Sequence, residues 1–108
     1  MILEVRGDPV PLPAGLDLSA YRIVQEALTN ALKHAGPTRA AVTVAYNPGE
    51  LHLEIVDHGP RERRARTAGR EGGHGLIGMR ERAALFHGTL TAGPLASGGF
   101  GVRAVLPL

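Results

Sequence analysis

Four polar side chains with complementary chemistry lie on neighbouring turns of one predicted helix: Glu26, Asn30, Lys33 and His34. Asparagine is a poor helix former away from helix ends, and a solvated position would be better filled by Glu, Lys or Gln. An amide oxygen suits a hard cation such as Mg²⁺, and a lysine ammonium suits a phosphate as a point charge. The ordinary alternative is a solvated face on which Glu26 supports Asn30 or Lys33 through their spacing on the helix.

A carboxylate stands at the end of a predicted strand, in the segment EIVDHG, where Asp57 is followed by Gly59. An Asp-x-Gly segment is commonly a simple turn. Beside a cleft, Asp57 could instead accept a hydrogen bond from an amino group such as the exocyclic amine of adenine. Gly59, which has no Cβ, would let a base approach the backbone.

Glycines gather where the second predicted helix begins, in the stretch GGHGLIGMRERAALF. Backbone amides at a helix start can bind phosphate, and Gly78 inside the helix costs roughly 1 kcal/mol relative to Ala. The alternative is a flexible loop followed by a close contact between helix and sheet. The pattern is neither a dinucleotide-binding fingerprint, since no strand directly precedes it, nor a Walker A loop, since it lacks Gly-Lys-Ser/Thr.

The hydrophobic pattern predicts the elements that must position these side chains. Residues 16–35 form the longest helix, with Asp17 or Ser19 as N-cap and Gly36-Pro37 as the stop. Its apolar face is expected to carry Val24, Ala27, Leu28, Ala31, Leu32 and Ala35. The other expected elements are a strand at 1–7, a hairpin at 39–57 turning at NPGE, a loop at 59–75, a helix at 76–88 and a hairpin at 88–108. This order predicts an α+β two-layer sandwich, a mixed but mostly antiparallel sheet with helices on one face.

The composition limits the class of protein. The chain has 108 residues, 44% of them hydrophobic, which fits one small globular domain. It has no cysteine, so disulfides and thiolate metal sites are excluded. No apolar run is long enough to span a bilayer, and the start lacks the pattern of a signal peptide. We therefore expect this domain to be cytoplasmic and not inserted into a membrane, whether or not a parent protein is membrane-anchored. The net charge of +2 gives little support for nucleic-acid binding.

The motifs, taken together and in this order, resemble those of a known family. YRIVQEALTNALKHA, then Asp-x-Gly after a hairpin, then GLIGMRERAALF, then a Gly-rich hairpin ending in VRAVLPL are similar to the ATP-binding catalytic domain of sensor histidine kinases. The resemblance runs from about Leu16 to Leu108 and is to the branch that phosphorylates LuxR-type response regulators. It implies the Bergerat ATP-binding fold, ATP and Mg²⁺ as cofactors, and transfer of the γ-phosphate to a histidine on a separate dimerisation domain.

The resemblance also implies roles for individual residues. Glu26 and Asn30 would be catalytic, with Asn30 ligating Mg²⁺ and Glu26 orienting water around the metal. Asp57 would bind adenine, and residues 60–74 would form a lid over the nucleotide. The implied ATP-binding residues are Asn30, Lys33, His34, Asp57, Gly59, Gly73, His74, Gly75, Leu76 and Gly78.

The sequence departs from the family pattern at two positions. Arg61 stands where a second glycine usually follows Gly59, and Phe100 stands where many members carry a Thr that helps to bind adenine through water. None of the five histidines resembles the family's phosphoacceptor. We therefore expect residues 1–108 to be a single catalytic domain cut from a longer kinase, without its dimerisation helices, and inactive alone in autophosphorylation.

Two other functions remain open at this stage. One is a stand-alone Ser/Thr kinase of the same fold, of the anti-sigma-factor type, which would also sequester a protein partner. The other is a nucleic-acid binder that uses the arginines between Arg61 and Arg70. No aromatic residue lies among these arginines, so a base-stacking surface is not indicated, and we expect no nucleic-acid partner.

Overall fold

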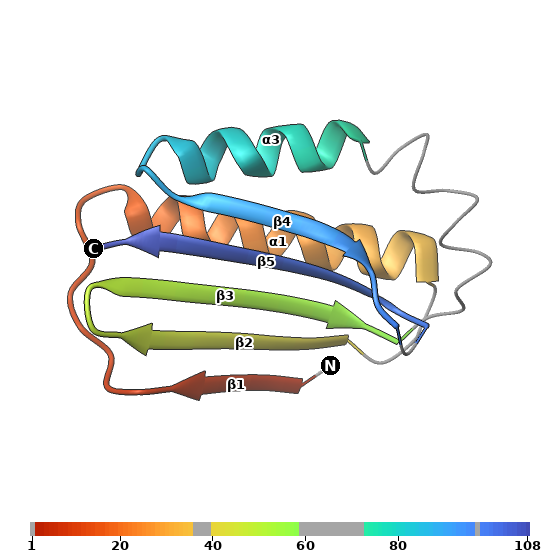
Figure 1. Ribbon diagram of the computed structural model, residues 1–108, viewed down its shortest axis with the longest axis horizontal. Helices are drawn as coiled ribbons and strands as arrows, with labels where there is room; N and C mark the ends of the chain where they lie inside the picture. Colours follow the sequence, from red (N-terminus) through yellow and green to blue (C-terminus); the bar gives the residue numbers. More distant parts are fainter. Residues whose placement is uncertain (1, 36–39, 59–72, 97) are drawn as a thin grey trace.

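The computed structural model describes residues 2–35, 40–58, 73–96 and 98–108, with the side chains of 32–35 and 73–75 left aside. The elements follow one another along the chain in the predicted order (Figure 1). They are β1 (Ile2–Arg6), α1 (Leu16–Ala35), β2 (Ala40–Asn47), β3 (Glu50–Asp57), α3 (Gly73–Ala84), β4 (Thr89–Pro94) and β5 (Phe100–Pro107). Among the described residues, no helix is long and apolar enough to cross a membrane.

The strands form one five-stranded sheet in the order β1-β2-β3-β5-β4. Two antiparallel hairpins, β2–β3 and β4–β5, lie side by side because β3 pairs antiparallel with β5. Among the described strands, β1 alone is parallel to its neighbour, which is β2. Both helices lie on one side of this sheet (Figure 1), so the predicted fold class, an α+β two-layer sandwich with a mostly antiparallel sheet, is confirmed.

The start of α1 differs from the prediction in one detail. The helix begins at Leu16, and the first helical hydrogen bond runs from the Ser19 amide to the Gly15 carbonyl at 3.0 Å. Gly15, with a φ of 85°, therefore takes the cap position, and the prediction of Asp17 or Ser19 as N-cap is wrong. Asp17 still supports the first turn, because its Oδ1 accepts a hydrogen bond from the Leu18 amide at 2.8 Å.

The buried face of α1 is rotated from the predicted one. Leu16, Ala20, Ile23, Ala27 and Ala31 are buried, whereas Val24 and Leu28 are only half-buried against the core. Ala27 and Ala31 belong to both faces, and periodicity alone favoured the flank that carries Val24 and Leu28. The sheet selects the flank that carries Ile23, which has the bulk to fill the space between the layers.

The end of α3 is closed by backbone geometry. His87 adopts a left-handed φ of 61°, its amide bonds the Ala84 carbonyl at 3.0 Å, and the Gly88 amide bonds the Ala83 carbonyl at 2.8 Å. These two bonds make a Schellman motif in which His87 takes the left-handed position. Gly88 is needed for a different reason, since a Cβ there would lie 2.6 Å from the Val105 carbonyl oxygen.

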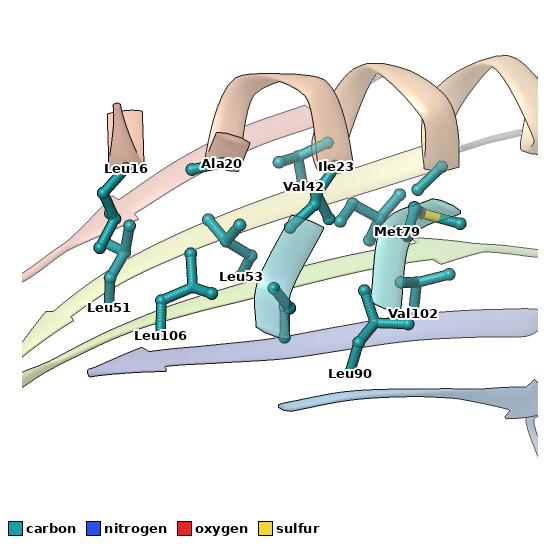
Figure 2. Packing of buried hydrophobic residues seen from close by; sticks show 14 residues of the cluster. Leu16, Ala20, Ile23, Val42, Leu51, Leu53, Met79, Leu90, Val102 and Leu106 are labelled. Carbon is teal, nitrogen blue, oxygen red and sulfur yellow. The ribbon is translucent and has the colours of Figure 1, made fainter. Parts of the chain in front are cut away.

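The core fills the space between the helices and the inward face of the sheet (Figure 2). Alternate residues of each central strand point into it, and Leu16 of α1 reaches toward Leu51 of β3 at one end. The largest fully buried side chains are Leu16, Ile23, Leu51, Leu53, Met79 and Leu106. This packing holds the two layers together and fixes the positions of the strand ends.

Candidate nucleotide-binding site

The ends of three secondary-structure elements that carry predicted site residues lie at the same end of the sandwich. The C-terminal end of α1, the last residue of β3 and the first turn of α3 all lie at the right-hand end of Figure 1. The opposite end holds the turn between β2 and β3 and the start of α1. The residues predicted from widely separated parts of the sequence are thus brought to a common region.

Asp57 is the last residue of β3 and is buried, with 3% of its surface exposed. It continues the inward-facing series of Leu51, Leu53 and Ile55, and it pairs with Ala40 on one side and Phe100 on the other. A carboxylate at an inward position costs free energy unless polar groups or a ligand compensate it. The structure thus places Asp57 at an inward position of a strand rather than in an exposed turn, and its role toward a nucleotide stays a prediction.

Asn30 and Glu26 lie on the flank of α1 next to its buried face. Both are half-buried, whereas their neighbours Gln25 and Thr29 are exposed. A fully solvated face is therefore not what the structure shows for these two residues. Their spacing of one turn brings a carboxylate and an amide oxygen to the same side of the helix, near its C-terminal half.

The buried side chains of α1 that face the sheet become smaller toward the candidate site. Ala27 and Ala31 are buried there, in place of the larger Leu16 and Ile23 nearer the start of the helix. Leu28 and Leu76 are half-buried at this end, so the described lining combines methyl groups, two leucines and the half-buried Asn30.

The first turn of α3 contains the predicted glycine stretch. α3 begins at Gly73, three residues before the predicted start, so Gly73, His74 and Gly75 have helical backbone, and no acidic residue lies in this turn. The helix start therefore offers backbone amides to an anion without a competing carboxylate in the turn. Leu76 follows and is half-buried against the core.

Gly78 does not make the close helix–sheet contact that the sequence left open. A Cβ at Gly78 would approach only the Arg82 guanidinium, at 3.3 Å, and this is the end of a flexible side chain. The described residues thus give no packing reason for this glycine, and its predicted place in the nucleotide site stays a prediction.

Several predicted site residues are outside what the structure describes. Lys33 and His34 belong to the last turn of α1 by their backbone, but their side chains are not described. Gly59 lies outside the described residues, as do residues 60–72 of the predicted lid and Arg61 within it. The contacts of these residues with a nucleotide remain predictions.

One residue of this region was not singled out from the sequence. Gly99 is buried in the loop before β5, and a Cβ there would lie 1.8 Å from the carbonyl oxygen of Asp57. The only signal in the sequence was the pair Gly98-Gly99 directly before a strand, which also fits an ordinary turn.

Three ion pairs among the described residues lie on the opposite, open face of the sheet. Arg103 contacts Glu54 at 2.7 Å, Arg6 contacts Glu4 at 3.0 Å, and His52 contacts Glu50 at 3.1 Å. The hydrogen bond from Arg6, together with the Arg6 charge, holds the pKa of Glu4 below its ordinary value. The same hydrogen bond, together with the Glu4 charge, raises the pKa of Arg6.

Two shallow grooves also lie on the open face. One of about 480 Å³ runs past Val56, Gly93 and Gly101, and one of about 370 Å³ runs past Thr43, Asn47 and His52. Glu54 and Arg103 line both grooves and pair with each other. These grooves are separated by the sheet from the predicted site residues and do not belong to the candidate site.

The family assignment follows from a comparison with known sequences. The family described as "Histidine kinase-, DNA gyrase B-, and HSP90-like ATPase" matches residues 15–108. The chain belongs to this family. It carries an ATPase fold of the histidine-kinase type, as its motifs predicted, and the family match supports ATP as its ligand.

Curated relatives point to the same branch that the motifs indicated. Sensor histidine kinase YxjM of Bacillus subtilis is 35% identical over 96 residues, which is 89% of this chain and 22% of that protein. The nitrate/nitrite sensor protein NarX of Escherichia coli is 33% identical over 97 residues, which is 90% of this chain and 16% of that protein. The chain thus spans about a fifth of the length of these relatives.

Solved structures agree with the fold. The histidine kinase domain of a blue-light activated histidine kinase from Erythrobacter litoralis matches with a TM-score of 0.69 and 25% identity, covering 99% of this chain and 54% of that one. The nucleotide-free catalytic domain of histidine kinase ThkA matches with a TM-score of 0.75 and 14% identity, covering 98% and 76%. At that identity the second match supports the fold alone.

Proposed function

We propose that this domain binds Mg-ATP at the end of the sandwich where α1, β3 and α3 meet, and donates the γ-phosphate to a histidine on a separate dimerisation domain. The observation that carries the proposal is the buried, inward-facing carboxylate of Asp57 at the end of β3, in a chain of the histidine kinase-like ATPase family. In this proposal the domain is the catalytic part of a longer two-component kinase.

Asp57 would select adenine. Its carboxylate accepts a hydrogen bond from the exocyclic amine, and guanine presents a carbonyl at the same position. Two acceptors would then face each other in a buried place, which costs roughly 1–3 kcal/mol or more. That cost corresponds to about tenfold or more in affinity.

The triphosphate would lie between α1 and the start of α3. Lys33 would neutralise phosphate charge, and the backbone amides at Gly73 to Gly75 would donate hydrogen bonds to phosphate oxygens. His34 would contact the ribose side, while Gly59, His74, Leu76 and Gly78 would line the nucleotide. The described first turn of α3 supports this arrangement because it carries no acidic residue.

The donor set of α1 fits a magnesium ion that is held mostly by phosphates and water. Mg²⁺ keeps several waters and needs only one or two protein oxygens, and Asn30 and Glu26 supply an amide and a carboxylate one turn apart. Asn30 would ligate the metal directly, and Glu26 would hold a metal-bound water. When bound, the ion would neutralise charge on the transferring phosphoryl group.

The phosphoacceptor would come from another part of the parent kinase. Of the histidines whose side chains are described, His52 is on the open face beside Glu50, and His58 and His87 are exposed at element ends. In-line transfer needs a nucleophile held close to the γ-phosphate. We propose that a dimerisation domain supplies it and that a LuxR-type response regulator is the next acceptor.

Binding is tested by titrating residues 1–108 with ATP and GTP, each with and without Mg²⁺, by calorimetry. We expect Mg-ATP to bind at least about tenfold more tightly than Mg-GTP. Equal affinities for the two nucleotides would contradict the role of Asp57, and no binding of either would contradict the proposed function.

Phosphotransfer is tested with γ-labelled ATP, first with residues 1–108 alone and then with the parent kinase's dimerisation domain added as a second chain. We expect no label on the isolated domain and slow, acid-labile label on the added chain. Transfer should be slow because the two domains are not covalently linked, so their effective concentration is low. Acid-labile label on residues 1–108 would place an acceptor within them. Acid-stable label on an added anti-anti-sigma substrate would favour the Ser/Thr kinase alternative.

A further inference from the structure

In the loop before β5, Gly99 packs against the backbone of Asp57, the proposed adenine-binding residue. The contact is too close for any residue with a side chain. A Cβ at Gly99 would lie 1.8 Å from the Asp57 carbonyl oxygen, 2.9 Å from its carbonyl carbon and 3.1 Å from the His58 Cα. These atoms are backbone and cannot rotate away as the end of a flexible side chain can. Glycine is therefore required at this position by a contact with the end of β3.

The loop that carries Gly99 is itself closed by hydrogen bonds. The Leu95 amide donates to the Gly99 carbonyl at 2.7 Å, and the Gly98 amide donates to the Leu95 carbonyl at 3.0 Å. Gly98 adopts a φ of 105°, which side chains rarely allow. These hydrogen bonds fix the position of Gly99 in the turn. A larger residue at 99 would therefore displace the end of β3 unless the turn itself opened.

We infer that Gly99 is the positioning residue of Asp57: it lets the β4–β5 loop rest directly on the backbone of residues 57 and 58 and so sets where the buried carboxylate lies. The inference rests on the proposed function, in which that carboxylate accepts a hydrogen bond from adenine. Gly99 itself contacts no nucleotide in this account. It acts through the backbone of the residue that does.

The register of the sheet explains why the displacement would reach the carboxylate. Asp57 is paired with Phe100, the residue directly after Gly99, and both are at the last rung of the β3–β5 ladder. Restoring van der Waals contact around a new Cβ requires a shift of about 1–2 Å. A shift of this size at the end of a strand exceeds the roughly 0.5 Å within which a binding group must be held.

The experiment compares ATP with purine riboside triphosphate, which lacks the exocyclic amine. The ratio of their two Kd values measures the contribution of that amine alone. We expect the wild-type domain to prefer ATP by about tenfold or more, and Gly99→Ala to reduce this ratio to within about twofold of one. The Kd of purine riboside triphosphate should stay within about twofold of wild type, because the phosphate-binding parts are not displaced.

Two glycines of the same hairpin supply matched controls. Gly93→Ala adds a methyl group in β4 where no atom of the described residues lies within 4 Å, so both Kd values should be unchanged. Gly98→Ala meets no atom either but strains the loop through its φ of 105°. It should lower the melting temperature while retaining the wild-type preference for ATP, which separates loop strain from displacement of Asp57.

The outcomes separate this inference from the function on which it rests. A wild-type domain that binds neither triphosphate, or binds both equally, contradicts the proposed function. A wild-type preference for ATP that persists in Gly99→Ala overturns the positioning role. Titrations of this variant are repeated in trimethylamine N-oxide, which favours the folded state. A Gly99→Ala protein that stays unfolded even there would make Gly99 a folding residue and would also overturn the inference.

Discussion

The two ends of the space between the helices and the sheet are built differently from the same elements. At one end β3 contributes Leu51 and Leu53 and α1 contributes Leu16, all almost fully buried. At the other end β3 ends in the buried Asp57 and α1 presents the half-buried Asn30. The inward-facing residues of β3 thus change from apolar side chains to a carboxylate, while the strand keeps its regular alternation up to Asp57.

This difference separates two tasks within one small domain. Large aliphatic side chains at the filled end supply the burial that holds helix and sheet layers together. At the other end the buried Asp57 and the half-buried Asn30 would, in the proposed function, bind the nucleotide. The stability of the fold and the chemistry of the proposed site should therefore respond to different substitutions.

The largest expected effect is a loss of stability at the filled end. Leu106→Ala removes a side chain with no exposed surface and should lower the free energy of unfolding by about 2–5 kcal/mol. Urea denaturation followed by circular dichroism measures this, with Leu85→Ala as control because Leu85 is 73% exposed. The folded Leu106→Ala protein should keep its preference for ATP over GTP. Loss of that preference would show that the two ends are not independent.

The next effect is on binding at the other end. Asp57→Asn keeps the size of the side chain but replaces one acceptor oxygen by a donor, so ATP affinity should fall about tenfold or more. Glu54→Gln is the matched control, since Glu54 is on the same strand but on the open face beside Arg103. Calorimetry should show weaker ATP binding for the first variant only. A similar loss of ATP affinity in both variants would mean that ATP binding depends on the total charge of β3 rather than on the Asp57 carboxylate.

A smaller effect is expected from the proposed metal ligand. Asn30→Ala should reduce the gain in ATP affinity that Mg²⁺ provides, while binding in EDTA changes little. Thr29→Ala, at the exposed neighbouring position, should leave both values at wild type. Equal losses with and without Mg²⁺ would indicate that Asn30 is structural or contacts the nucleotide directly.

The smallest effect concerns β1, which lies outside both ends. Arg6 lowers the pKa of Glu4 from its ordinary value of 4.5, so this pair stabilises the fold above that pH. The contribution is lost as the pH falls through the lowered pKa of the folded state. Melting curves from pH 6 to pH 2 should show that Arg6→Gln slightly reduces the acid sensitivity of the fold without changing nucleotide preference. A large change would mean that β1 contributes more to stability than its exposure suggests.

Most of the elements could be predicted from the sequence because their signals are local. The alternation in 40–47 and 50–57 around the turn at Asn47-Pro48-Gly49, and the length of the apolar pattern in 16–35, are complete within each segment. The sequence predicts a start of α3 three residues later than the observed one, because glycines are poor helix formers. The N-cap of α1 was misassigned because Asp17 and Ser19 are common caps, whereas the structure uses Gly15.

The candidate site was predicted in part. Asp57, Asn30 and the glycines of 73–78 can be singled out because their residue types are unusual for the elements that contain them, while their roles toward a nucleotide stay predictions. The burial of Asp57 and the rotation of α1 that buries Ile23 are set by packing between helix and sheet, whereas periodicity alone favoured a different face of the helix. Gly99 was missed because its contact partner lies on a strand that is far away in the sequence.

The sequence by itself determined the kinds of elements, their order and the residue types available for chemistry, since these follow from local periodicity, turn residues and propensity. Tertiary structure decided the strand order β1-β2-β3-β5-β4, the parallel pairing of β1 with β2, and the approach of the Gly99 loop to the end of β3. These depend on contacts between segments that are distant in the chain, where the energy of packing and the exclusion of overlapping backbone atoms, rather than any local pattern, select one arrangement.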